Sequence, residues 1–180
     1  RPPRSTLFPY TTLFRSHVPL KHCFPGDVEK LFLPLSFDLI ASASTFQWFT
    51  TPEETFKKLS KRLEQRGVLV FSTFGKFNLR EIRLTTGGGL DYRNKEELEK
   101  MLKPYFEIEL IEEEFHMLEF DTPLAVLQHL KKTGVNVSGD PTIWTKGRVD
   151  AFIKDYNARF AIDGKVALTY HPLYFVCRKR

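Results

Sequence analysis

Two apolar runs in the sequence each end in small hydroxyl-bearing residues. The first run, SFDLIASAS, covers residues 36–44, and the second, GVLVFSTFG, covers residues 67–75. Short apolar runs of this kind are typical of strands buried in a parallel sheet. Ligands of such sheets bind at the carboxyl ends of the strands. The sequence therefore predicts a ligand-binding edge formed by residues 42–48 and 72–77.

The glycine triplet, the cysteines and the acidic cluster of the sequence do not have the pattern of a phosphate or metal site. Gly87–Gly89 form a glycine triplet, but the G-K-[ST] of a phosphate loop does not follow it. Cys23 and Cys177 lie far apart and have no C-x-x-C or histidine spacing, so we expect reduced thiols in a cytosolic protein. The acidic cluster Glu112–Glu114 favours a solvated turn or bulge over a metal site. We expect no metal.

The two strands are joined by a predicted helix. TPEETFKKLSKRLEQRG, residues 51–67, offers a threonine cap, Pro52 in the first turn and Gly67 as a stop. Its apolar stripe is Phe56, Leu59 and Leu63, with spacings of three and four. Strand, helix and strand together predict a βαβ unit, which brings both strand tips to the same edge.

The remaining chain predicts further elements. A short helix begins at Arg93 or Asn94 and ends before Pro104, and residues 106–120 alternate as a half-exposed strand of the outer sheet. Helices follow over residues 122–134, with the stripe Leu124, Leu127 and Leu130, and over residues 145–160. The last strand, residues 166–177, contains Pro172 and should be interrupted there. The pattern predicts an α/β fold that ends in an antiparallel strand pair.

The composition is that of a globular domain. The 180 residues are 42% hydrophobic and include 17 phenylalanines, so a sizeable core can form. No apolar run is long enough for a transmembrane helix, and we expect no membrane partner. The net charge is +5, but Arg1, Arg4 and Arg15 supply three of these charges without an acid nearby. The basic balance is therefore poor evidence for nucleic-acid binding.

The opening stretch RPPRSTLFPYTTLFRS differs from the rest of the chain. Pro9 interrupts the apolar run that a signal peptide needs, and the prolines oppose the amphipathic helix of a transit peptide. TLFPYTTLFRS resembles a translated sequencing adapter. We therefore expect residues 1–16 to be a non-native leader and residues 17–180 to be the C-terminal part of a single domain.

Several separated motifs resemble one protein family. GDVEKLFLPLSFDLIASASTFQWF, residues 26–49, resembles the region around the fourth strand of class I S-adenosylmethionine methyltransferases. FQW at residues 46–48, STFGKFNLREI at 72–82, HLKKTGVN at 129–136 and LTYHPLY at 168–174 narrow the resemblance to malonyl-acyl-carrier-protein O-methyltransferases of biotin synthesis. The resemblance implies a partial Rossmann-like sheet that lacks its first strands, and S-adenosylmethionine as the cofactor.

The resemblance also implies roles for cofactor-binding residues. Asp27 would accept a hydrogen bond from the adenine amino group, and Val28 would offer its backbone N–H to the ring. Ser42 would line the methionine side at the strand tip. The structural alternatives are a surface turn for Asp27 and an ordinary strand end for Ser42. The glycine-rich loop of the superfamily is absent from the sequence, so we expect a fragment that is inactive alone.

On the substrate side, the resemblance implies Gln47 and Trp48 at the mouth of the site and Tyr170 and His171 on the last strand. Arg80 is the first candidate to hold a malonyl carboxylate, with Lys131 or Lys132 as alternatives. This carboxylate is already ionised at neutral pH, so the resemblance implies no catalytic base, and His171 is not required as one. An amide cap, a core indole and solvated charges are the corresponding structural alternatives.

The implied partner is an acidic acyl carrier protein that carries a malonyl thioester. Four basic residues are candidates for its docking surface, although a solvated helix face is the favoured explanation for each one taken alone: Lys131, Lys132, Lys146 and Arg148. We expect a monomer. Two other functions stay open, namely a methyltransferase for another small acid or a quinone precursor, and a non-catalytic interaction fragment with an unpaired sheet edge.

Overall fold

The structure, a computed structural model, describes residues 26–33, 36–134 and 145–180. The chain divides into two compact units, residues 1–35 and 36–180, which are described separately. In the first unit, Asp27 opens a turn. Its carbonyl oxygen accepts the N–H groups of Lys30 at 2.9 Å and Leu31 at 2.7 Å, and its carboxyl group accepts the N–H of Glu29 at 3.0 Å.

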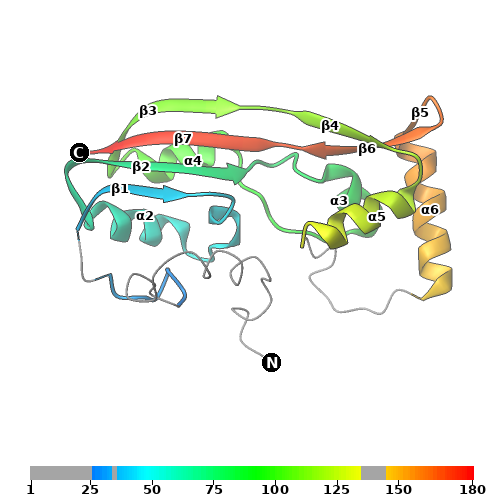
Figure 1. The fold of residues 1–180 in the computed structure, drawn as a ribbon, viewed down its shortest axis with the longest axis horizontal. Coiled ribbons are helices and arrows are strands. Elements are labelled where there is room, and N and C mark those ends of the chain that lie inside the picture. The colour runs from blue at the N-terminus through cyan, green and yellow to red at the C-terminus, as the bar shows by residue number, and fades with distance from the viewer. Residues whose placement is uncertain (1–25, 34–35, 135–144) are drawn as a thin grey trace. The chain divides into compact units, whose positions relative to one another are not determined.

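The second unit contains a four-stranded mixed sheet. Its strands are β1 (Phe37–Ser42), β2 (Leu63–Phe74), β3 (Phe106–Glu113) and β7 (Pro172–Lys179), in the order β1-β2-β7-β3. β1 pairs parallel to β2, whereas β7 runs antiparallel to both β2 and β3 (Figure 1). The predicted parallel pair, the antiparallel C-terminal strands and the outer position of β3 are confirmed.

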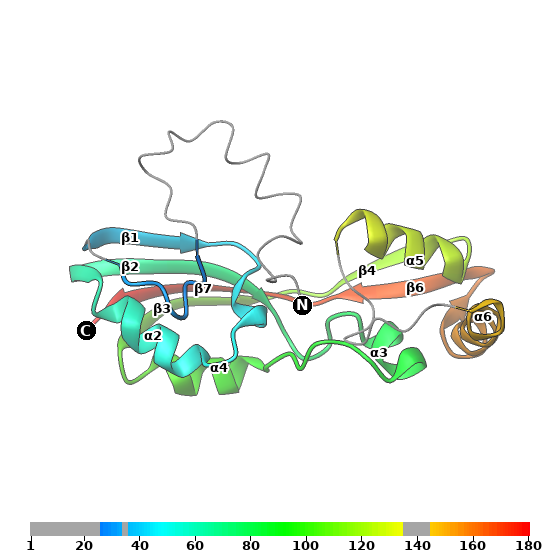
Figure 2. The same cartoon turned by 90° about the horizontal axis from the view of Figure 1, so that it is seen from below.

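One face of this sheet is covered by α2 (Pro52–Ser60) and α4 (Lys95–Leu102), which lie on the same side of the strands in Figure 2. Phenylalanine rings pack on this face of the sheet. Phe46 lies 4.4 Å from Phe71 between ring centroids, and Phe71 stacks on Phe175 at 4.8 Å. The many phenylalanines therefore build the predicted core.

The predicted helix over residues 51–67 is wrong in its second half. α2 ends at Ser60, and Leu63 already belongs to β2. Leu63 is buried, and the Phe37 N–H donates to the Arg62 carbonyl oxygen at 2.8 Å. Strand pairing therefore begins where the helical pattern would continue. The register of β1 on β2 shifts between Phe37 and Leu39, and Arg66 has a left-handed φ of 63°.

A second, three-stranded sheet has the order β4-β6-β5, with β4 at His116–Phe120, β5 at Ala161–Ile162 and β6 at Lys165–Tyr170. α3 (Arg80–Thr86), α5 (Pro123–Lys132) and α6 (Lys146–Phe160) gather near β6 (Figure 1). The residues buried between them are Leu79, Ile82, Val126, Leu130, Phe152, Tyr156, Val166 and Leu168.

Two segments of the chain run from one sheet into the other. β6 leads into β7 at His171, and β3 leads into β4 at Glu114 and Phe115. The predicted interruption at Pro172 is confirmed, because a proline cannot donate to the strand ladder. The predicted single strand over residues 106–120 is instead two strands, which break opposite His171.

The other predicted helices of both sheets are confirmed with small changes. Thr122 and Thr145 cap α5 and α6 with their side chains, and Asn94 forms a capping box with Glu97 at α4. In α5 Leu130 is buried and Leu127 packs against the core, as predicted, whereas Leu124 is wrong because it is 43% exposed and Val126 is buried instead. Helix α3 is not among the predicted elements.

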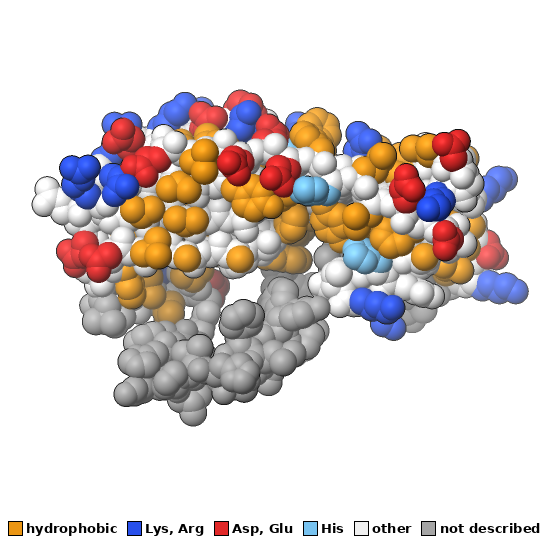
Figure 3. All heavy atoms as spheres, turned by 45° about the horizontal axis from the view of Figure 1, so that its top comes forward, with side chains coloured by type: hydrophobic (Ala, Val, Ile, Leu, Met, Phe, Trp, Pro, Cys, Tyr) orange, Lys and Arg blue, Asp and Glu red, His pale blue; other side chains and the backbone are white. Residues whose placement is uncertain are grey.

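The other face of the four-stranded sheet is apolar and visible in Figure 3. Its exposed side chains include Leu39 on β1, Val70 on β2, Leu110 on β3 and Tyr174 on β7. Within the described residues, no helix is long and apolar enough to span a membrane.

Candidate functional site

The carboxyl ends of β1 and β2 are joined by direct hydrogen bonds. The Ser44 N–H donates to the carbonyl oxygen of Ser72 at 3.0 Å and to its hydroxyl oxygen at 3.1 Å. Gln47 donates from Nε2 to the Ser44 carbonyl at 2.6 Å and accepts from the Thr73 hydroxyl at 3.3 Å. The prediction that both strand tips meet at one edge is confirmed, and Gln47 spans that edge.

An aromatic group follows the end of β2. Phe74, the last residue of the strand, lies 6.5 Å from the Tyr92 ring and 6.2 Å from the Tyr170 ring. The Tyr170 hydroxyl contacts His129 Nε2 of α5 at 2.9 Å. Burial raises the pKa of Tyr92, with partial compensation by the Asn78 side chain and the Arg83 charge. Burial also raises the pKa of Tyr170. Both phenols therefore stay protonated at neutral pH and act as hydrogen-bonding groups.

His171 fastens the loop after β2 to the junction of β6 and β7. Its carbonyl oxygen accepts the Gly75 N–H at 2.8 Å, and its Nδ1 accepts the Phe77 N–H at 3.1 Å. Because Nδ1 is an acceptor, the ring proton belongs on Nε2, which donates to Glu113 at 2.8 Å. Phe115 stacks on the ring at 4.2 Å, and His171 is only 1% exposed. His171 therefore holds a loop of the site in place.

The pair of His171 and Glu113 predicts a pH-dependent stability. The hydrogen bond from His171, with help from Lys95, lowers the pKa of Glu113 below its ordinary value. The stability that the ionised Glu113 carboxylate contributes is complete above the unfolded pKa of about 4.3. It disappears as the pH falls through the lower, folded pKa. We expect Glu113→Gln to lower the free energy of unfolding by about 1 kcal/mol at pH 7 and by much less at pH 3.

Urea unfolding at both pH values measures this difference. Glu114→Gln is the matched control, because Glu114 pairs with exposed His116 and should contribute little. An equal loss for Glu113→Gln at pH 7 and pH 3 would show that its charge is not the stabilising feature.

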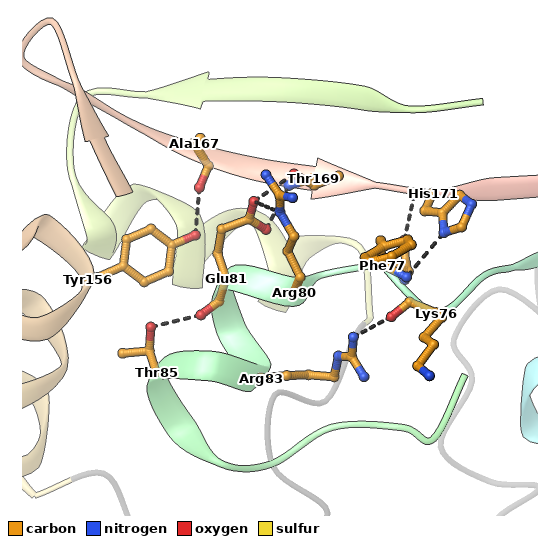
Figure 4. A network of polar contacts seen from close by, with 11 residues as sticks. Lys76, Phe77, Arg80, Glu81, Arg83, Thr85, Tyr156, Ala167, Thr169 and His171 are labelled. Atoms are coloured by element: carbon orange, nitrogen blue, oxygen red, sulfur yellow. Dashed lines mark hydrogen bonds and ion pairs between the residues drawn. The ribbon is translucent and has the colours of Figure 1, made fainter. Parts of the chain in front are cut away.

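Helix α3 is fixed to β6 by Glu81. This carboxyl group is 1% exposed and accepts the Thr169 N–H at 2.9 Å and the Thr169 hydroxyl at 2.6 Å. Arg80 donates from Nε to the same carboxyl group at 3.1 Å, and its own side chain is 51% exposed. Figure 4 shows Arg80 reaching toward β6, whereas Arg83 of the same helix reaches toward Lys76.

The structure brings only some of the predicted residues together. Three of them lie on elements that reach the ends of β1 and β2, namely Ser42, Gln47 and Tyr170. Trp48 is 39% exposed and ends the short helix η3 (Phe46–Trp48), which follows β1. Asp27 and Val28 lie in the first unit, which is not placed relative to this edge. Their adenine-binding roles stay predictions, as do the substrate-binding roles of the residues at the edge.

The basic residues expected to meet a carrier protein lie on α5 and α6. Lys131 and Lys132 are in the last turn of α5, while Lys146 and Arg148 are in the first turn of α6. All four are exposed. Residues 135–144, the end of the HLKKTGVN motif included, lie outside the described residues, and so does Cys23. In the described part of the chain, no cluster of histidine, cysteine and acidic residues could hold a metal ion.

Sequence reasoning missed Glu81, Arg83 and Tyr92. The available signal was the charged segment Arg80–Arg83, which follows the end of β2 after a short loop. Their proximity to the edge depends on α3 folding back against β6, which no local pattern shows.

The strand order and the edge described above define an α/β fold of the class I methyltransferase type. YcgJ from Bacillus subtilis matches this fold with a TM-score of 0.60 and 15% identity, over 86% of this chain and 69% of that one. A putative methyltransferase from Bacillus halodurans matches with a TM-score of 0.59 and 16% identity, over 85% and 69%. Residues 11–71 also match a family model described as a methyltransferase domain.

The sequence resemblance to malonyl-acyl-carrier-protein O-methyltransferases is confirmed. The protein of that name from Bacteroides helcogenes is 46% identical over 158 residues, which cover 87% of this chain and 57% of the relative. Its counterpart from Haemophilus influenzae is 42% identical over 154 residues, covering 85% and 59%. The chain thus spans less than two thirds of the length of these relatives.

Proposed function

We propose that this chain forms the substrate side of an enzyme that methylates the free carboxylate of a malonyl thioester on acyl carrier protein. The observation that carries the proposal is the joined edge of β1 and β2, with the rings of Phe74, Tyr92 and Tyr170 grouped at the end of β2, in a chain that is similar to proteins named for this reaction. We place the enzyme in the cytosol, in line with the free thiol of buried Cys177.

The residues present fit part of an S-adenosylmethionine site. The small side chains of Ser42, Ala43 and Ser44 leave the tip of β1 open to a close approach, as a nucleoside-bearing ligand requires. S-adenosylmethionine supplies the methyl group, which it carries on a sulfonium. Asp27 and Val28 would hold its adenine ring, and Ser42 would line its methionine side.

The chain's own residues have a simple task in this reaction. A malonyl carboxylate is ionised at neutral pH, so no residue has to remove a proton from it. Methyl transfer then depends on the position of the carboxylate oxygen and on removal of water from it. The aromatic rings of Phe74, Tyr92 and Tyr170 exclude water, while Gln47 holds the two strand tips at a fixed separation.

Two measurements test this proposal. The 180-residue chain should bind malonyl-acyl carrier protein more tightly than the acetyl form, which lacks the carboxylate. A fusion that adds the preceding segment of the Bacteroides helcogenes relative should convert the malonyl form to its methyl ester, detected by mass spectrometry as one added methyl group. Equal binding of both forms would overturn the proposed substrate, and so would a fusion that methylates a different acid.

A further inference from the structure

Arg83 differs from the other arginines around α3. Arg80 pairs with Glu81, and Arg159 pairs with Asp155 at 2.9 Å. Arg83 has no carboxyl partner among the described residues. Its single hydrogen bond there runs from Nη2 to the Lys76 carbonyl oxygen. The guanidinium of Arg83 therefore has a charge that no acidic side chain of the described chain balances.

Part of this guanidinium is shielded from water, and no described residue supplies an acceptor for it. The Nε atom of Arg83 is buried and has no hydrogen-bond partner within residues 26–33, 36–134 and 145–180. A buried donor on a charged group is unfavourable until an acceptor reaches it. Buried polar atoms of this kind are rare in native proteins and point to a missing partner. A carboxylate satisfies a guanidinium best, because its two oxygens match the geometry of the N–H groups.

The side chain of Arg83 is held in place on several sides. Its guanidinium lies over the Tyr92 ring, 5.9 Å from the centroid. A Cβ at Gly89 would lie 2.7 Å from Arg83 Cγ, so the glycine lets the loop pack directly on the stem. The Lys76 carbonyl belongs to the loop after β2, and Figure 4 shows Arg83 directed at that loop. These contacts keep the cation at the carboxyl end of β2.

Resting on the proposed function, we propose that Arg83 binds the free carboxylate of the malonyl group, in place of Arg80. Arg80 is already paired with Glu81 and is directed toward β6. Arg83 instead contacts Tyr92, whose ring lies beside Phe74 at the end of β2. Hydrogen bonds from Arg83 orient the malonyl carboxylate. They hold it at the edge where the small residues at the end of β1 admit the cofactor.

Binding of the full chain to two carrier-protein forms tests this inference. We expect the wild type to bind the malonyl form about tenfold more tightly than the acetyl form, as a charge-assisted hydrogen bond allows. Arg83→Gln should remove this preference and leave the affinity for the acetyl form unchanged. Arg159→Gln is the matched control, since Arg159 donates to the Leu84 carbonyl of the same helix from outside the site. It should keep the full preference.

Each outcome decides a separate point. A preference that survives in Arg83→Gln overturns the role of Arg83 and leaves the proposed substrate in place. No preference in the wild type overturns the proposed substrate itself. Arg83→Lys keeps the charge and covers the case in which Arg83→Gln does not fold. It should lose most of the preference because the planar fork is gone, and an undiminished preference would also overturn the role of Arg83.

Discussion

Replacing Glu81 by alanine should lower the free energy of unfolding by about 4 kcal/mol. The substitution leaves the Thr169 N–H and hydroxyl without their acceptor in a buried position and removes the partner of Arg80. Glu81→Gln keeps the shape but directs an amide NH₂ at one of these donors, so we expect a loss of about 2 kcal/mol. Chemical denaturation followed by circular dichroism measures both values.

The control for Glu81 is Asp155→Asn, which makes a similar chemical change in an exposed pair with Arg159 and should cost less than about 1 kcal/mol. Thr169→Val provides a second check. The double variant of Thr169→Val and Glu81→Gln should lose less free energy of unfolding than the sum of the two single losses, because both substitutions remove the same hydrogen bond. Full additivity would show that the two residues do not act together.

Gly75→Ala should be the second strongly destabilising substitution, with a loss of about 3 kcal/mol. A Cβ at Gly75 would lie 2.4 Å from Cε1 and 2.6 Å from Nδ1 of His171. The ring cannot move aside easily, because Phe77, Glu113 and the stacked Phe115 hold it in a buried position. We expect the loop after β2 to lose its attachment to the junction of β6 and β7.

The space around the added methyl group can be tested directly. In a His171→Ala background, Gly75→Ala should cost much less, since the clashing ring is gone. Gly147→Ala is the matched control, because a Cβ at Gly147 meets nothing within 4 Å, and it should cost no stability. A similar loss for Gly75→Ala with and without His171 would rule out the ring as its cause.

Much of the fold follows from local sequence patterns. Pro172 marks the break between β6 and β7, and Thr122 and Thr145 mark the starts of α5 and α6. Each of these signals acts within a few residues, so no tertiary information is needed. The early start of β2 at Leu63 is different. Leu63 suits the helical stripe equally well, and only its pairing with Phe37 makes it a strand residue.

The candidate site could be predicted only in outline. The polar ends of β1 and β2 predict the binding edge, because parallel neighbours end on the same side. Helix α3 gives a weak local signal. Its N-cap position is Leu79, in a left-handed conformation with no side-chain cap, so tertiary contacts such as that of Glu81 with Thr169 must stabilise it. The choice between Arg80 and Arg83 depends on how this helix is rotated.

The central claim is that a malonyl thioester binds at the carboxyl ends of β1 and β2. Backbone amide NMR of the 180-residue chain, titrated with malonyl-acyl carrier protein and then with the acetyl form, tests it most directly. We expect shifts specific to the malonyl form at Ser44, Phe74, Phe77, Arg83 and Tyr92. Malonyl-specific shifts confined to α2 or α6, with these residues unchanged, would contradict the claim.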